Sequence, residues 1–362
     1  FPGAAAPHGR PEDPDRTVAR HGRAGRRRDR CRGVGKRAPA AGFQRTGTGL
    51  GSGSAGDPPG HPVARRHRLH RRGGHRPVPA PRHGTAQCPR LAGVPQGALR
   101  RAATAGGGLM SGLLQETRGT VRLLRFDNPA RRNALSPALR MELLRALEAA
   151  ECDPSIRSVL LTGGEEVFCA GGDLGDMRVT ELAAGRARMQ DNARLVRQMV
   201  RMGKPLIAAV EGWAVGAGLS VALACDSIVC GAGARFAAGF GKVGLLADLG
   251  QLHTLPARIG WGRARQILMF GQVVQAEEAL RIGLADRLCA AGGALAMALE
   301  LAGRVEQQAP LPLAMTKALL AEGLDLLLER EGELQSQLFL SADHAEGKAA
   351  FLAKRPPVFR GN

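Results

Sequence analysis

Aromatic residues and long apolar runs are scarce in this sequence. Tyrosine is absent from its 362 residues, which include only two tryptophans and ten phenylalanines. No window of about 18 apolar residues is free of charges and turn signals, so no membrane-spanning helix is predicted. After Met110 the cysteines show no CxxC or Cys/His spacing. This absence argues against a zinc or redox motif and favours buried, reduced thiols in a cytoplasmic protein.

Charge is distributed very unevenly along the chain. The chain has 51 basic and 32 acidic residues. Residues 1–109 hold 22 of the basic and 5 of the acidic residues, so residues 110–362 hold 29 basic and 27 acidic residues. The first segment consists mainly of Arg, Gly, Pro, Ala and His, without a period of 2 or 3.6 residues. Such a segment cannot bury enough apolar surface to offset the entropy of ordering. We therefore predict that residues 1–109 are disordered.

Three interpretations of residues 1–109 remain open. A basic arm for nucleic acid is one, but no aromatic residues are interleaved for base stacking. A transit peptide is another, although serine is scarce and Pro and Gly interrupt any amphipathic helix. We favour the third, in which the natural chain begins at Met110, its first methionine, and the upstream part is not natural coding sequence or is a vestigial extension. Nucleic-acid binding is then not expected.

Strand-like and helix-like patterns alternate after Met110. Short apolar runs at 121–126, 158–162 and 206–210 are strand-like, and helical patterns follow each of them. From about Ala294 the pattern is helical almost to the end. Repeated units of this kind predict an α/β fold with largely parallel strands.

Two glycine-rich turns, 169–174 and 215–219, follow the second and third of these strands. Small residues at a strand-to-helix junction let a ligand approach the backbone and leave N–H groups pointing outward. Two such turns could direct two N–H donors at one oxygen, as a catalyst requires in order to hold an oxyanion. The alternative is that both turns are merely tight connections in the fold.

Several segments, in the same order along the chain, resemble the crotonase, or enoyl-CoA hydratase/isomerase, superfamily. The matching segments are 127–135, 168–174, 204–218, 243–248, 255–256, 279–286 and 346–355. The resemblance implies a crotonase-like spiral of ββα units, with a core at 110–292 that holds an acyl-CoA site. It also implies a helical C-terminal region at 293–362 that covers CoA and forms homotrimers or dimers of trimers. No metal, nicotinamide or flavin is implied, because CoA enters as part of the thioester substrate.

The resemblance places the oxyanion hole at the backbone N–H groups of Ala170 and Ala217. A thioester carbonyl between them would have its enolate stabilised by hydrogen bonds and by the dipole of the helix that follows Ala217.

The acid–base groups depart from those of a hydratase in this family. Its two glutamates correspond here to Ser220 and Phe240, neither of which can exchange a proton as a carboxylate does, so ordinary hydration is doubtful. Asp248 instead matches the aspartate of members that move double bonds, such as dienoyl-CoA isomerases and the ring-epoxide isomerases of phenylacetate breakdown. The apolar run before it favours a raised pKa and a proton shuttle. The alternative role for Asp248 is the N-cap of a helix that begins at Leu249.

We therefore predict an enoyl-CoA isomerase in which Asp248 moves the proton through an enolate. A 2-enoyl-CoA hydratase or acyl-CoA hydrolase with an unidentified base, and a non-catalytic acyl-CoA-binding homologue, remain as alternatives. Further contacts with the substrate or its CoA are expected from Arg131, Arg132, Ala134, Gly171, Gly172, Asp173, Leu174, Trp213, Gly216, Gly218, Ser220, Phe240, Phe351 and Lys354. Several of these side chains also have a structural alternative: the two arginines as a solvated pair, Asp173 as a turn-stabilising residue, Trp213 and Phe240 as packed aromatics, and Lys354 as a surface lysine. Glu211, Asp226 and His253 are expected to be structural.

Overall fold

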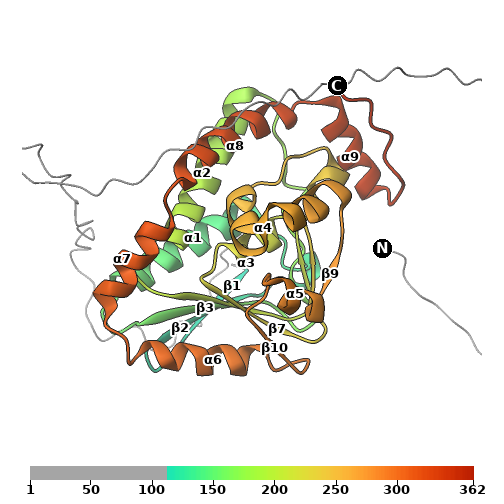
Figure 1. Ribbon diagram of the computed structural model, residues 1–362. Coiled ribbons are helices and arrows are strands. Elements are labelled where there is room, and N and C mark those ends of the chain that lie inside the picture. Colours follow the sequence, from blue (N-terminus) through green and yellow to red (C-terminus); the bar gives the residue numbers. More distant parts are fainter. Residues whose placement is uncertain (1–111) are drawn as a thin grey trace, which may run out of the picture. The chain divides into compact units, whose positions relative to one another are not determined.

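The computed structural model describes residues 112–362, so the predictions for residues 1–109 and for a start at Met110 lie outside the described residues. Two sheets and the helices packed around them make up this part of the chain (Figure 1). None of its helices is both long enough and apolar enough to cross a membrane.

The larger sheet carries the predicted parallel core. Its strands lie in the order β1 (Leu113–Arg118), β2 (Val121–Phe126), β3 (Ser158–Thr162), β5 (Leu206–Val210), β7 (Ser227–Gly231) and β10 (Arg287–Cys289). β1 and β2 pair antiparallel, and the other neighbouring strands pair parallel. All residues of β3 and β5 are buried, which is typical of parallel strands covered on both faces.

The smaller sheet consists of short strands that follow those of the larger one. Its order is β4 (Val167–Cys169), β6 (Trp213–Val215), β8 (Arg235–Ala237) and β9 (Val274–Gln275). β4, β6 and β8 come directly after β3, β5 and β7, and a helix follows each pair. This repetition of ββα units is the predicted spiral.

The predicted helical patterns of the core form helices. They are α1 (Pro137–Cys152), α2 (Leu182–Arg201), α3 (Ala217–Leu223), α4 (Gln251–Phe270) and α5 (Ala276–Ile282). Ser136 caps α1 by accepting a hydrogen bond from the N–H of Leu139, with proline at the first helical position. In α4 the backbone of Gly260 is not helical, so the helix is kinked at this residue.

The predicted C-terminal helical region forms α6 (Ala294–Val305), α7 (Pro310–Leu320), α8 (Leu324–Leu338) and α9 (Ala342–Leu352). α6 packs on one face of the larger sheet through Ala294, Ala298 and Ala302, which are spaced four apart and buried. α8 runs beside α2 (Figure 1), and this pairing brings C-terminal side chains to the candidate site.

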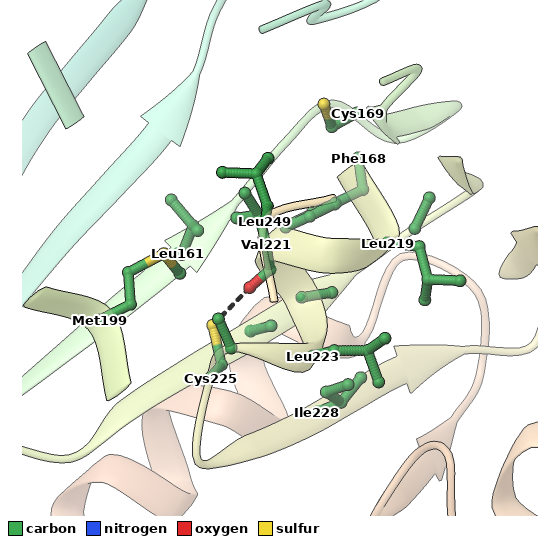
Figure 2. Close-up of a cluster of buried hydrophobic side chains, with 14 of the residues drawn as sticks. Leu161, Phe168, Cys169, Met199, Leu219, Val221, Leu223, Cys225, Ile228 and Leu249 are labelled. Carbon is green, nitrogen blue, oxygen red and sulfur yellow. Dashed lines mark hydrogen bonds between the residues drawn. The ribbon is translucent and has the colours of Figure 1, made fainter. Parts of the chain in front are cut away.

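α3 is buried at every residue and lies at the centre of the main core, with side chains of β3, β4 and α2 around it (Figure 2). The thiol of Cys225 donates to the carbonyl oxygen of Val221 within this core. Cys169, Cys225 and Cys230 are buried free thiols and Cys289 is a half-buried one, as expected. The expectation of reduced thiols throughout is wrong at Cys152, which is disulfide-bonded.

Candidate active site

The two glycine-rich turns lie against each other. β4 pairs with β6, so the turns that follow these strands begin at neighbouring positions. A Cβ atom added to Gly171 would lie 2.9 Å from the carbonyl oxygen of Val215 and 3.7 Å from the nitrogen of Ala217. Gly171 and Gly216 both have positive φ, of 109° and 54°, which side chains other than that of glycine rarely allow. Glycine is therefore required where the two turns meet.

The N–H of Ala170 is already engaged, since it donates to the carbonyl oxygen of Arg132 at 3.0 Å. This bond removes Ala170 from the predicted pair of oxyanion donors. The N–H of Gly172, two residues later, donates to no acceptor within the described part of the chain. The residues on either side of it are engaged, since the N–H of Leu135 donates to the carbonyl oxygen of Gly171 and the N–H of Asp173 donates to that of Leu135. Gly172 therefore offers the unpaired N–H of the first turn.

The second turn offers the N–H of Ala217, the first residue of α3. The first N–H groups of a helix have no acceptor within it. Ala217 also donates to no loop acceptor in residues 112–362, whereas the N–H of Gly216 donates to Ala237 and that of Ser220 donates back to Gly216. Gly172 and Ala217 thus form a pair of unengaged N–H groups on two adjoining turns.

Asp248 does not cap a helix. α4 begins at Gln251, Gly250 occupies the cap position, and no side chain caps it, so the alternative role for Asp248 is wrong. The side chain is instead buried, with 7% of the residue exposed. Asn192 of α2 donates to its Oδ2 at 3.4 Å, while its Oδ1 has no partner among the described residues.

The charge of Asp248 is subject to two opposing influences. Burial raises the pKa of Asp248, and the guanidinium groups of Arg140 and Arg188, followed by the side-chain amide of Gln335, act against this rise. Both arginines are themselves largely buried, so desolvation lowers the pKa of each, to about 10 for Arg140. A buried carboxyl with a raised pKa and one free oxygen is suited to proton transfer near neutral pH.

An apolar cavity of about 440 Å³ lies between the segment 238–247 and helix α4. Phe240 lines it and lies beside the turn, because a Cβ on Gly216 would be 4.0 Å from Cζ of this ring. Leu246 and Ala247, which directly precede Asp248, also line the cavity. Its size and apolar lining suit a small organic group whose polar end lies at the turns.

A second buried carboxyl, that of Glu331 on α8, was not predicted. Its Oε2 accepts a hydrogen bond from the N–H of Gly250 at 3.0 Å, and only 2% of the residue is exposed. Burial, together with the charge of Asp248, raises the pKa of Glu331 to about 8. One helical turn further on, Gln335 bonds to both the N–H and the carbonyl of Leu246. The spacing of four places Glu331 and Gln335 on one helix face, but only the fold shows that this face covers Asp248.

Ser220 lies beneath the second turn rather than in the cavity. The residue is fully buried, with its Oγ 3.2 Å from the carbonyl oxygen of Gly216 and 3.1 Å from Oε1 of Gln251. The Nε2 of Gln251 is buried without a partner in the described part of the chain. Ser220 therefore supports the turn, and it supplies no carboxylate.

Some of the residues around the first turn that were predicted to contact CoA form bonds within the protein, and others are exposed. Arg131 forms ion pairs with Asp173 at 2.6 Å and with Asp176 at 3.2 Å. Asp173 also accepts from the N–H of Gly175, so it shapes the loop. Arg132 is exposed and makes no side-chain ion pair with any described residue, while Ala134 is half-buried and its N–H bonds to Arg131.

Four other predicted contacts are aromatic or apolar side chains and a lysine. Trp213 is half-buried in β6 with the guanidinium of Arg235 5.2 Å from its ring, and Leu174 packs beside Met177 and Val243. Phe351 is 59% exposed on α9, and Lys354 is exposed just beyond that helix.

Gly218 has a packing role, because a Cβ added there would lie 2.3 Å from the carbonyl oxygen of Cys169. Glu211 accepts from the N–H of Ala294 at the start of α6, and Asp226 pairs with Lys317 at 2.6 Å, so both are structural as predicted. No group of three or more His, Cys, Asp or Glu within residues 112–362 is arranged to hold a metal ion.

Comparison with known proteins places these features in a family. Residues 116–362 match the family described as enoyl-CoA hydratase/isomerase. A 2,3-dehydroadipyl-CoA hydratase from Escherichia coli K12 is 36% identical over 256 residues, covering 70% of this chain and 100% of the relative. A 1,2-epoxyphenylacetyl-CoA isomerase from the same organism is 33% identical over 261 residues, covering 70% and 100%.

Solved structures show the same similarity. An enoyl-CoA hydratase from Mycobacterium avium subsp. paratuberculosis K-10 superposes with a TM-score of 0.63 and 29% identity, covering 69% of this chain and 99% of the other. An enoyl-CoA hydratase/isomerase from Pseudoalteromonas atlantica T6c gives a TM-score of 0.62 and 30% identity, covering 69% and 100%.

Proposed function

This chain belongs to the enoyl-CoA hydratase/isomerase family of acyl-CoA enzymes, and within that family we propose that it is an isomerase that shifts a C=C bond of an enoyl-CoA thioester. The observation that carries the proposal is Asp248, a buried carboxyl beside the cavity with one oxygen left unpaired. Ser220 and Phe240 offer no second acid–base group.

The thioester carbonyl would lie between the N–H groups of Gly172 and Ala217, with the acyl chain in the apolar cavity. Asp248 takes a proton from a carbon of the acyl group, and the electrons of that C–H bond move through the conjugated system to the carbonyl oxygen. Two N–H donors stabilise the resulting enolate, and loss of one such donor typically lowers kcat by about a hundredfold to a thousandfold. Asp248 then returns the proton to a different carbon, so the double bond has moved and no water is consumed.

The CoA part of the substrate would extend over the first turn. Arg132 is exposed there and makes no ion pair with a described residue, so its guanidinium is available for a CoA phosphate, whereas Arg131 is held by two carboxylates. The proposed step needs no further cofactor, because CoA is part of the substrate.

We also propose that the enzyme forms trimers or dimers of trimers. Large apolar side chains of α4 are exposed in the single chain, with Trp261 at 67%, Met269 at 74% and Phe270 at 75%. Exposed apolar groups gathered on one element are typical of protein interfaces. Light scattering of the purified protein tests this proposal, and a monomeric mass would contradict it.

Hydration is the second candidate function. It needs one group to activate water and another to deliver a proton, and the neighbouring carboxyls of Asp248 and Glu331 could supply both. The relative from E. coli that is 36% identical is named a hydratase. Glu331 is, however, bonded to the backbone of Gly250, whereas Oδ1 of Asp248 has no partner among the described residues, which favours a single proton-transfer group and therefore isomerisation.

Mass spectrometry of the reaction products separates the two functions. The protein is incubated with 2-enoyl-, 3-enoyl- and dienoyl-CoA, first in H₂O and then in D₂O. An isomerase gives a product of unchanged mass but altered chromatographic retention in H₂O, and an Asp248→Asn variant gives no such product. The deuterium that the product gains in D₂O measures how often the proton on Asp248 exchanges with solvent before it is returned. A mass gain of one water would contradict the isomerase proposal.

A further inference from the structure

The backbone that presents Asp248 has an unusual conformation. Leu249 and Gly250, the two residues after Asp248, are both left-handed, with φ of 55° and 71°. A leucine held in this region is strained, so the surroundings must keep it there. Leu249 is 1% exposed and packs in the main core. Packing anchors the leucine side chain, but it does not by itself satisfy the backbone of the turn.

α8 supplies the missing backbone partners. The carboxyl of Glu331 accepts the N–H of Gly250 at 3.0 Å. Gln335, on the same helix face, holds Leu246 through bonds of 2.9 and 3.0 Å. α8 therefore forms hydrogen bonds with the chain on both sides of Asp248. The bonded residues are 81 positions apart for Glu331 and Gly250 and 89 positions apart for Gln335 and Leu246.

The charged groups around Asp248 come from three helices. Arg140 of α1 and Arg188 of α2 face it and favour its ionised form, and Asp191 of α2 acts in turn on Arg140. Glu331 of α8 is influenced by the charge of Asp248 but by neither arginine. The pKa of Glu331 is raised to about 8, so Glu331 keeps its proton near neutral pH.

We propose that Glu331 is a positioning residue for the catalytic base: its carboxyl accepts the N–H of Gly250 and so holds the left-handed turn that presents Asp248. This inference rests on the proposed role of Asp248 as the base. Ionisation of Glu331 would place a second negative charge beside Asp248 in the buried site, whereas a neutral group at this position adds none.

Glu331→Ala and Glu331→Gln separate the two parts of this role. Glu329→Gln is the matched control, because Glu329 is exposed on the same helix. Alanine removes the acceptor for the N–H of Gly250, whereas glutamine keeps a carbonyl acceptor and removes the titrating group. Each full-length variant is examined by amide hydrogen exchange of residues 246–251 and by the dependence of kcat and KM on pH.

Three results are expected. Glu331→Ala exchanges faster at the amides of Leu249 and Gly250, and its kcat falls about tenfold to a hundredfold with little change in KM, as expected for a displaced base. Glu331→Gln recovers most of this loss, and it lacks the decline in kcat above pH 8 that the unmodified enzyme shows. Glu329→Gln behaves as the unmodified enzyme does in every measurement.

Unchanged exchange and kcat in Glu331→Ala would overturn the inference, as would an alkaline decline that persists in Glu331→Gln. If the alanine variant does not fold, the pH profile of the glutamine variant decides. Full activity of Asp248→Asn would overturn the proposed function itself, and the catalytic role of Glu331 with it. An inactive Asp248→Asn beside an unperturbed Glu331→Ala would overturn the inference alone.

Discussion

Asn192 donates a hydrogen bond from its Nδ2 to Oδ2 of Asp248 at 3.4 Å, across 56 residues of sequence. The bond fixes one oxygen of the carboxylate against α2 and leaves Oδ1 without a partner in the described part of the chain. A base that is held by one oxygen and free at the other has a defined direction for proton transfer. The predictions below test this arrangement and the turns that accompany it.

Asp248→Asn should lower kcat for enoyl-CoA isomerisation by about a hundredfold to ten-thousandfold, because general-base catalysis is lost while the size of the side chain is kept. Conversion of 3-enoyl-CoA, followed by chromatography, measures the effect. Asp127→Asn is the matched control, since this aspartate is exposed just after β2. Equal losses in the two variants would argue against a specific role for Asp248.

Asn192→Ala should shift the acid limb of the rate profile to higher pH. A donated hydrogen bond favours the ionised carboxylate, so its removal raises the pKa of Asp248 further. The profile of kcat/KM against pH measures the shift, with Gln190→Ala, exposed on the same helix, as control. A shift to lower pH would contradict the assignment of the donor.

Gly171→Ala should lower kcat by about a hundredfold or more, because it disturbs the meeting point of the two turns. Its Cβ would lie 2.9 Å from the carbonyl oxygen of Val215, at a φ of 109°. Gly164→Ala is the control, since the nearest atom to its Cβ would be 3.7 Å away. Steady-state kinetics of both variants test this, and similar rates in the two would remove the turns from the mechanism.

Glu331→Gln should make the folded state less sensitive to pH. The folded protein raises the pKa of Glu331 from 4.5 to about 8, so the folded state binds this proton more tightly than the unfolded state does. The free energy of unfolding therefore falls as pH rises between these values, and the glutamine variant lacks that contribution. Urea titrations at pH 5 and pH 8 measure the difference, and an identical fall in both proteins would contradict the prediction.

Much of the fold was predictable from local patterns. β3 and β5 were predicted because their runs are almost wholly apolar, and β2 was predicted although two arginines interrupt its apolar residues. β1 was missed because all but its first residue are exposed, so its sequence lacks an apolar run. The short strands β4 and β6 were not predicted, since three residues are too few to show a period.

The candidate site was predictable only in part. Both turns and Asp248 were identified from sequence, but the choice of donor within the first turn was not correct. Ala170 and Gly172 are both small and lie in one turn, and the bond from the N–H of Ala170 to the carbonyl oxygen of Arg132 distinguishes them. Glu331 was missed because charged residues on a helix usually face solvent, and its neighbour Glu329 does so.

The sequence by itself determined the ββα repetition, the two glycine turns and the position of one carboxyl among apolar residues, because these features depend on neighbouring residues. Only the tertiary structure decided which N–H groups stay unpaired and which side chains surround Asp248. Those properties depend on contacts between segments far apart in the chain, such as α8 with the turn that ends at Gly250. Such contacts decide which polar groups are hydrogen-bonded and which side chains are buried, and they cannot be predicted from neighbouring residues in the sequence.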